Sequence, residues 1–464
     1  MAPGLVLGLK PPVRLLAGAD GLEEAGRRRL RLAPGAGEGQ RRLLRALAEG
    51  GATEEALCPT LELSYLLALV EREGWVSRSL VRDGRVLAVL EPLAPEFRFR
   101  PAAGEGPWRL SRLAWLRRDG AGAVLESPLG FVRVRLPAPD LLAALGRLWE
   151  PCRARDLPGL AAPLAAGFLA MLASAGAAAP CGPEGLLPED LDPALRPWEF
   201  HDLLFHSRSR PGRHGAPAGA TLRFLGELEA PPALEPARAE AIPLPEPGPA
   251  GPGPAFFHVL EARRSIRVPG PQAITLAQLG AFLHHVARVR RVLPPDPGAG
   301  RPFETALGPC PGGGALHELE LYLAASRCAG LDPGFYHYAA GRHAMERLAG
   351  PEAAAPLVRQ AQEAMGGRPA PDILLTLAAR AQRVAWKYQG IAYALILKDT
   401  GVLLQQMYLV ATALGLAPCA IGTGDSEAFA RAAGVDFTRA APVGEFALST
   451  SVPACRPPGP PDRA

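Results

Sequence analysis

Two adjacent residues, Lys387 and Tyr388, have side chains suited to proton transfer. They stand next to a long, mostly apolar segment, and a lysine that enters an apolar environment has a lowered pKa, which suits it as a general base. An adjacent tyrosine can share or relay the proton. The alternative is a lysine that reaches from a helix end into water, and the residues alone favour that alternative.

A second candidate set consists of Arg263, Arg264, Ser265 and Arg267, which place three guanidinium groups and a hydroxyl within five residues. Such groups can hold a phosphate and a carbonyl. A run of solvated charges is the alternative, and the spacing alone favours it.

Two glycine-containing segments allow close approach of the backbone to a ligand. The first consists of Gly312, Gly313, Gly314 and Ala315, and it precedes a predicted strand. The second, Ile421 and Gly422, lies between a predicted strand and a predicted helix, where backbone N–H groups can meet a ligand. A flexible surface loop and an ordinary strand–helix turn are the respective alternatives.

Metal binding is not expected. His201, His206 and His214 match no zinc spacing, and the seven cysteines contain no C-x-x-C pair. Dispersed, reduced thiols are typical of a cytosolic protein.

The composition predicts a soluble, cytoplasmic protein of two to four domains. The chain has 464 residues and a net charge of +4, which gives no case for nucleic acid as a partner. The N-terminus lacks the pattern of a signal peptide. The charge-free stretch 157–183 is rich in alanine, glycine and proline, so we predict a buried helix there and no membrane span.

A proline-rich stretch, 229–254, is predicted to be an extended connector. Before it, residues 1–95 predict two helices, near 39–47 and 61–72, and a hairpin that turns at Asp83-Gly84, which is the outline of a winged helix. Acidic residues near the second helix favour a peptide clamp over DNA binding. Residues 96–228 predict a second clamp-like or helical domain.

Residues 255–464 predict long helices interleaved with strands, and therefore a helix-covered sheet. A helix is expected over 387–415. It is apolar nearly all round, so it should lie in the core or at a dimer interface.

Taken in order, the motifs resemble the nitroreductase superfamily and, within it, the SagB-type dehydrogenases. The matching segments are Arg263–Arg267, Pro311–Tyr322, Gly330–Tyr338, Lys387-Tyr388 with Ala392-Tyr393, Gly401–Gln406, Ala411–Leu416 and Gly422–Asp425. Upstream, Trp198–Asp202 and Phe205–Arg210 also resemble the longer members, which include the cyanobactin thiazoline oxidases.

The resemblance implies an α+β fold, a C-terminal nitroreductase-like FMN domain with a mainly antiparallel sheet, preceded by winged-helix-like peptide-clamp domains. It implies a homodimer with FMN at its interface, the arginines and Ser265 on the phosphate and polar edge, and the glycine segments along the ring. It also implies that Lys387 and Tyr388 act in oxidising azolines of a precursor peptide to azoles, with a cyclodehydratase as a further partner. An NAD(P)H-dependent nitroreductase and a non-catalytic peptide scaffold are the alternative functions.

Overall fold

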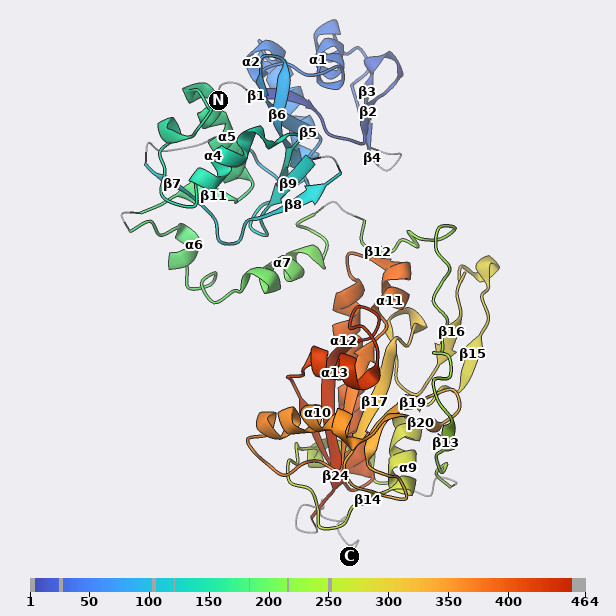
Figure 1. Ribbon diagram of the computed structural model, residues 1–464. Coiled ribbons are helices and arrows are strands. Elements are labelled where there is room, and N and C mark those ends of the chain that lie inside the picture. The colour runs from blue at the N-terminus through green and yellow to red at the C-terminus, as the bar shows by residue number, and fades with distance from the viewer. Residues whose placement is uncertain are drawn as a thin grey trace, which may run out of the picture. The chain divides into compact units, whose positions relative to one another are not determined.

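The computed structural model describes residues 5–24, 28–101, 106–120, 122–182, 184–214, 217–248 and 253–452 (Figure 1). The chain divides into an N-terminal unit, Met1–Pro217, and a C-terminal unit, Ala218–Ala464. Each unit has hydrophobic cores of its own. The division therefore falls before the proline-rich stretch 229–254, where the sequence predicts the connector.

The N-terminal unit contains the predicted helices and hairpin. The predicted helices are α1 (Glu38–Ala48) and α3 (Leu61–Arg72), and a short helix that was not predicted, α2 (Glu54–Leu57), lies between them. Thr60 caps α3 by accepting a hydrogen bond from the backbone N–H of Leu63 at 3.4 Å. Strands β5 (Val76–Arg82) and β6 (Arg85–Pro92) form the hairpin, and Asp83 and Gly84 both have positive φ, 51° and 74°, which is typical of a type I′ turn.

One six-stranded sheet joins the two segments that the sequence predicts as separate clamp-like domains. Its order is β1-β5-β6-β10-β9-β8, with β1 (Leu5–Leu9), β8 (Trp115–Asp119), β9 (Gly122–Glu126) and β10 (Val132–Leu136). The link is the antiparallel pairing of β6 with β10, in which Leu90 lies opposite Val134. Both side chains lie in one core, so burial of the free edge of the hairpin explains why the segments merge.

Shorter elements complete the N-terminal unit. They are β2 (Val13–Leu15), β3 (Gly21–Glu24), β4 (Arg28–Arg31), β7 (Trp108–Leu110), α4 (Leu142–Arg147), β11 (Ala178–Pro180), α6 (Pro188–Leu191) and α7 (Phe200–Arg208). The charge-free stretch forms α5 (Ala162–Ser174), most of which is buried, so the predicted buried helix is confirmed. Among the described residues, no helix has the length and apolar character that crossing a membrane requires.

The C-terminal unit is built on a seven-stranded sheet in the order β13-β20-β19-β17-β21-β24-β23. Its strands are β13 (Ala241–Pro243), β17 (Leu319–Ala325), β19 (Gly334–Ala339), β20 (Ala344–Ala349), β21 (Ile373–Ala379), β23 (Leu416–Ile421) and β24 (Ala441–Thr450). Every neighbouring pair is antiparallel. The predicted mainly antiparallel sheet is confirmed.

Helices cover both faces of this sheet (Figure 1). α9 (Leu276–Ala287) and α12 (Ala392–Ala413) share one core with Leu321, Leu323 and Leu375. α10 (Pro351–Ala364) and α13 (Ser426–Ala433) share the opposite core with Tyr322 and Leu374. Alternate residues of each strand thus enter opposite cores, as the period of two in a strand requires.

The remaining elements of the C-terminal unit lie around this sandwich. They are β12 (Gly219–Ala220), α8 (Phe256–Ala262), β14 (Ile274–Thr275), β15 (Arg291–Leu293), β16 (Thr305–Leu307), β18 (Cys328–Ala329), α11 (Ala381–Lys387) and β22 (Tyr388–Gln389).

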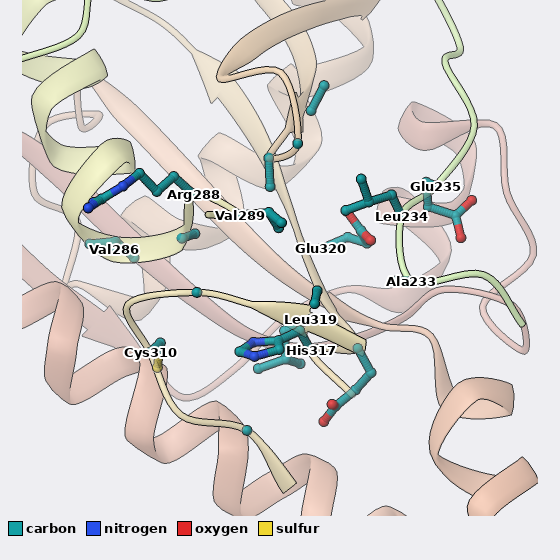
Figure 2. Close-up of a pocket in the computed structure, with 18 of the residues that line it drawn as sticks. Ala233, Leu234, Glu235, Val286, Arg288, Val289, Cys310, His317, Leu319 and Glu320 are labelled. Carbon is teal, nitrogen blue, oxygen red and sulfur yellow. The ribbon is translucent and has the colours of Figure 1, made fainter. Parts of the chain in front are cut away.

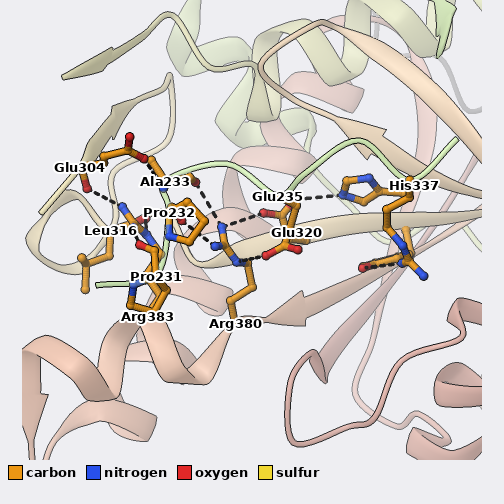
Figure 3. Close-up of polar contacts among 12 residues, drawn as sticks. Pro231, Pro232, Ala233, Glu235, Glu304, Leu316, Glu320, His337, Arg380 and Arg383 are labelled. Atoms are coloured by element: carbon orange, nitrogen blue, oxygen red, sulfur yellow. Dashed lines mark hydrogen bonds and ion pairs between the residues drawn. The ribbon is translucent and has the colours of Figure 1, made fainter. Parts of the chain in front are cut away.

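The described part of the proline-rich stretch, residues 229–248, is a strap bound to the C-terminal unit and differs from the predicted connector. β13 within it pairs with β20 at the edge of the sheet, where proline is tolerated. Figure 3 shows how two arginines hold the strap: Arg380, which directly precedes α11, and Arg383 within α11. Arg380 donates to the carbonyls of Pro232 and Ala233 at 2.6 and 3.2 Å, and pairs with Glu235 at 2.5 Å.

Arg383 joins the strap to two other segments. It is 2% exposed and donates to the carbonyls of Leu316, Pro231 and Glu304 at 2.6, 2.5 and 2.7 Å. Proline has no N–H, so a proline-rich chain cannot satisfy its own carbonyls by forming a helix or ladder. External donors such as Arg383 supply these bonds, which is why composition alone could not predict where the stretch lies.

We expect Arg383→Met to lower the free energy of unfolding of the C-terminal unit by at least about 3 kcal/mol, because three carbonyls lose a charged donor. Urea unfolding followed by circular dichroism measures the change. Arg359→Met, on the exposed face of α10, is the control and should change stability by less than about 0.5 kcal/mol. Equal stabilities of the two variants would contradict this role of Arg383.

Candidate active site

The glycine loop, defined as residues 311–315, lies directly against Lys387. Lys387 Nζ donates to the carbonyl of Gly314 at 3.3 Å. Gly314 has φ 65°, and a Cβ there would lie 2.6 Å from Lys387 Nζ and closer still to the Tyr388 hydroxyl. The structure thus brings Gly312, Gly313, Gly314 and Ala315 together with both residues of the Lys-Tyr pair.

The sequence predicts that Lys387 begins the long helix, but in the structure Lys387 is the last residue of α11. Tyr388 and Gln389 are extended and pair as β22 with β12. Gly390 follows with φ 74°, and α12 begins only at Ala392. A left-handed glycine at this position interrupts the helix, and the apolar pattern that continues across it conceals the break.

Burial and a neighbouring positive charge favour the neutral form of Lys387. The rings of Phe303, which is buried, and of Tyr388 have their centres 4.6 and 5.1 Å from Lys387 Nζ, and these cation–π contacts by themselves favour the ammonium form. Burial lowers the pKa of Lys387, and the nearby positive charge of Arg383 lowers it further.

Tyr388 keeps its proton in the same surroundings. Burial raises the pKa of Tyr388, and the negative charge of Asp399 adds to the effect. The pair therefore combines an amine that readily becomes a proton acceptor with a phenol that remains a hydrogen-bond donor, which is an arrangement suited to general base chemistry.

Asp399 of α12 holds the glycine loop from the side of that helix. One carboxylate oxygen accepts a hydrogen bond from the Gly313 N–H at 2.7 Å. Sequence reasoning did not select Asp399. A signal was present, because it is the single acidic residue between positions 392 and 413 of a largely apolar helix.

The arginine segment, defined as residues 263–267, lies along β23. Ser265 Oγ and Tyr408 Oη are hydrogen-bonded at 2.7 Å, and the guanidinium of Arg263 lies 5.2 Å from the ring centre of Tyr408. The Ile266 N–H donates to the carbonyl of Pro418 at 2.8 Å. Arg264 and Arg267 are exposed beside these contacts.

Tyr408 connects this segment to β23, because its hydroxyl also accepts a hydrogen bond from the Ala420 N–H at 2.8 Å. Ile421 and Gly422 complete the same strand end, Ile421 buried and Gly422 exposed. The structure thus gathers the arginines, Ser265, Ile421 and Gly422 around β23. Sequence reasoning missed Tyr408, a polar residue on a largely apolar helix.

The two groups of candidate residues contact α12 at different places. Asp399 contacts the glycine loop, and Tyr408, nine positions further along the helix, contacts the arginine segment. Nine residues correspond to roughly 13 Å along the axis and two and a half turns, so these two side chains leave opposite sides of α12. A single copy of the chain therefore presents the two groups on different sides of the helix.

A cavity of about 120 Å³ lies behind the glycine loop (Figure 2). Its walls include Cys310, Gly312, His317, Glu318 and Asp399. Lys387 and Tyr388 are not among the residues that line it. The cavity and the Lys-Tyr pair thus contact different parts of the glycine loop, since residues 311 and 312 line the cavity and Lys387 contacts Gly314.

No group of three or more histidine, cysteine, aspartate or glutamate side chains in the described part of the chain could hold a metal ion.

Two family models match the chain. One, described as cyanobactin oxidase ThcOx, matches residues 108–215, and the other, the nitroreductase family, matches residues 260–448. A protein of Methanocaldococcus jannaschii named as a nitroreductase is 30% identical over 164 residues, which are 35% of this chain and 76% of that protein.

Solved structures that are similar share lower identity. A Ralstonia eutropha nitroreductase has a TM-score of 0.37 and 18% identity, covering 51% of this chain and 99% of its own. A chain of the E. coli microcin synthetase McbBCD complex, with truncated pro-MccB17 bound, has a TM-score of 0.32 and 20% identity. The match covers 53% of this chain and 86% of that one. An Exiguobacterium sibiricum nitroreductase in complex with FMN has a TM-score of 0.30 and 15% identity, and the match covers 45% of this chain and 93% of that one.

The nitroreductase model extends from α8 to β24 and so includes the arginine segment, the glycine loop and the Lys-Tyr pair. The cyanobactin oxidase model covers much of the N-terminal unit, including Trp198–Asp202 and Phe205–Arg210. The M. jannaschii relative is matched over most of its length. The C-terminal unit is thus a nitroreductase-like oxidoreductase domain, and the chain belongs to the nitroreductase family.

Proposed function

We propose that the protein is an FMN-dependent oxidase that converts azoline rings of a modified peptide to azoles. The observation that carries this proposal is the contact of Lys387 with Gly314 at 3.3 Å, which places a general base against the glycine loop. The match of residues 108–215 to the cyanobactin oxidase model supports the substrate class.

The candidate residues fit FMN. Arg263, Arg267 and Ser265 offer cationic and hydroxyl donors for its phosphate and polar edge. Gly314 has no side chain, which lets the Lys-Tyr pair lie directly against the loop on which a flat ring system would bind, because a Cβ there would collide with both residues. Bound there, FMN would supply the two-electron acceptor for the reaction.

The protein's own residues supply the proton chemistry. Oxidation of an azoline removes a hydride and a proton from adjacent ring carbons, and the C–H electron pair of the deprotonated carbon forms the new double bond. Lys387 Nζ, in its neutral form, accepts that proton. Tyr388 keeps its own proton and donates a hydrogen bond that helps to orient the substrate. Dioxygen is the terminal oxidant in this proposal.

The site requires two copies of the chain in this proposal. The arginine segment and the glycine loop lie at opposite sides of α12, so a second copy is needed to bring one of each together. Exposed apolar residues support the homodimer: Tyr393, Leu397 and Val402 on α12 are 48%, 41% and 42% exposed, and Phe257 on α8 is 78% exposed.

The N-terminal unit is proposed to bind the precursor peptide, and a cyclodehydratase is the proposed partner that forms the azolines. Leader binding by a winged-helix-like clamp in residues 1–95, and by a second one in 96–228, remains part of this proposal. The support is the cyanobactin oxidase match within this unit.

The test is the absorbance spectrum of the purified protein, followed by addition of a thiazoline-containing peptide without air. We expect flavin absorbance that bleaches on addition of the peptide and recovers with oxygen. A yellow protein that ignores the peptide and bleaches with NADPH would establish a reductase in its place, as the name of the M. jannaschii relative suggests. A colourless protein that cannot be reconstituted with FMN would leave only a peptide-binding scaffold.

A further inference from the structure

Two carboxyl groups, those of Asp399 and Glu318, lie beside the glycine loop and line the cavity next to it. Asp399 accepts the Gly313 N–H at 2.7 Å, and Glu318 and Asp399 both line the cavity, close enough for their side chains to interact. Glu318 is 1% exposed, and its Oε1 atom has no hydrogen-bond partner among the described residues. An unpartnered carboxyl oxygen buried this deeply costs free energy, so the pair calls for an explanation.

A shared proton provides that explanation. Two carboxylates are both acceptors and repel each other, whereas a protonated carboxyl can donate to a neighbouring carboxylate. Burial raises the pKa of Glu318 to about 7, and the charge of Asp399 contributes in the same direction. Near neutral pH, Glu318 therefore carries the proton for much of the time.

The other ionisable groups near the pair do not replace this proton. Arg383 lowers the pKa of Glu318 to a lesser extent, and its guanidinium already donates to the carbonyls of Leu316, Pro231 and Glu304. Burial, and secondarily Arg383, lower the pKa of His317, which favours the neutral imidazole. Cys310, whose pKa burial raises to about 11, remains a thiol.

We propose that Glu318 is a positioning residue that donates a hydrogen bond to Asp399, keeps Asp399 on the Gly313 amide, and so fixes the glycine loop against Lys387. The inference rests on the proposed function only in taking this loop as the flavin-binding surface. The glycine loop thereby couples the buried proton on Glu318 to the position of Lys387.

The proposal predicts a specific pH dependence. The folded-state pKa of Glu318 lies above the ordinary value of 4.5, so its contribution to stability is complete below pH 4.5 and is lost as pH rises to about 7. Glu445, whose pKa burial also raises to about 7, titrates in the same range. The informative quantity is therefore the difference between the wild type and a Glu318 variant.

The experiment compares Glu318→Gln, Glu318→Leu and the wild type. The glutamine amide can donate to Asp399 without titrating, whereas leucine cannot donate. FMN affinity, from quenching of flavin fluorescence, is measured between pH 6 and 9, and the melting temperature of the apoprotein between pH 4.5 and 9. Glu352→Gln, at the exposed start of α10, is the matched control.

For the wild type we expect the Kd for FMN to rise above pH 7 by up to about tenfold per pH unit. Glu318→Gln should show a nearly constant Kd, Glu318→Leu a weakened one at every pH, and Glu352→Gln the wild-type profile. Equal pH profiles of the wild type and Glu318→Gln, or equal affinities of the glutamine and leucine variants, would overturn the proposal.

The apoprotein measurement separates this inference from the proposed function. If no form binds FMN, the flavin proposal fails, but the melting temperatures still decide the role of Glu318. The gain in melting temperature of Glu318→Gln over the wild type should grow from pH 4.5 to 7 and then level off. A constant difference across that range would contradict the shared proton.

Discussion

Replacing Lys387 with glutamine should slow bleaching of the flavin by a thiazoline peptide by about 10²–10⁴-fold, while FMN remains bound. Glutamine still offers an N–H donor in place of the ammonium that contacts the Gly314 carbonyl at 3.3 Å, but it has no basic lone pair. Single-turnover absorbance under anaerobic conditions measures the rate. The flavin spectrum before addition of peptide reports whether the cofactor is retained.

Lys398→Gln provides the matched control for this substitution. Lys398 is one of only three lysines in the chain and lies exposed on α12. The control removes the same charge from the same unit, so its rate should stay within about twofold of the wild type. A Lys387→Gln enzyme as fast as this control would show that another group takes the proton.

The pH dependence should identify the base independently. A general base acts when neutral, so at saturating FMN, and in the Glu318→Gln background that removes the titration of Glu318, the rate should rise with pH and level off above the pKa of Lys387. Because burial and Arg383 lower that pKa, the plateau should begin below the ordinary lysine value of 10.5. In Lys387→Gln, this rising limb should disappear from the residual rate.

Local signals allowed much of the C-terminal fold to be predicted. α13 begins at Ser426 and ends at Ala433 as predicted, because Asp425 caps it by accepting the N–H of Glu427 and Ala428 at 3.0 and 2.9 Å. β19 likewise has the predicted bounds Gly334–Ala339. Such ends depend on neighbouring residues, which the sequence displays directly.

Contacts between distant residues could not be predicted in this way. The pairing of Leu90 with Val134 joins two segments that each have their own turn and strand patterns in the sequence. That they share one sheet becomes visible only in the structure, where both side chains are buried in one core. The contact of Gly313 with Asp399 spans 86 positions. The placement of the proline-rich strap depends on donors that come from α11 and its boundary.

The candidate residues themselves were selected by type and by family resemblance, and the structure shows how far that suffices. The sequence identifies Gly314 and Lys387 but assigns Lys387 to the wrong helix, because the interruption at Gly390 requires a positive φ that composition does not reveal. The error matters for mechanism, since the end of α11 directs the amine to the glycine loop.

Gly314→Ala should therefore disable the enzyme without unfolding it. A Cβ at this position would lie 2.6 Å from Lys387 Nζ and closer to the Tyr388 hydroxyl, so the Lys-Tyr pair must move. Displacement of a catalytic group by about 1 Å can cost about 10²-fold in rate. We expect a loss of that size in anaerobic flavin bleaching.

Gly300→Ala separates this collision from backbone strain. Gly300 has φ 69°, close to the 65° of Gly314, but a Cβ there meets no atom within 4 Å. Both variants should lose about 1–2 kcal/mol of stability through the left-handed backbone, measured by urea unfolding. Only Gly314→Ala should lose activity. Equal rates in the two variants would mean that contact between the glycine loop and the Lys-Tyr pair is not needed for proton transfer.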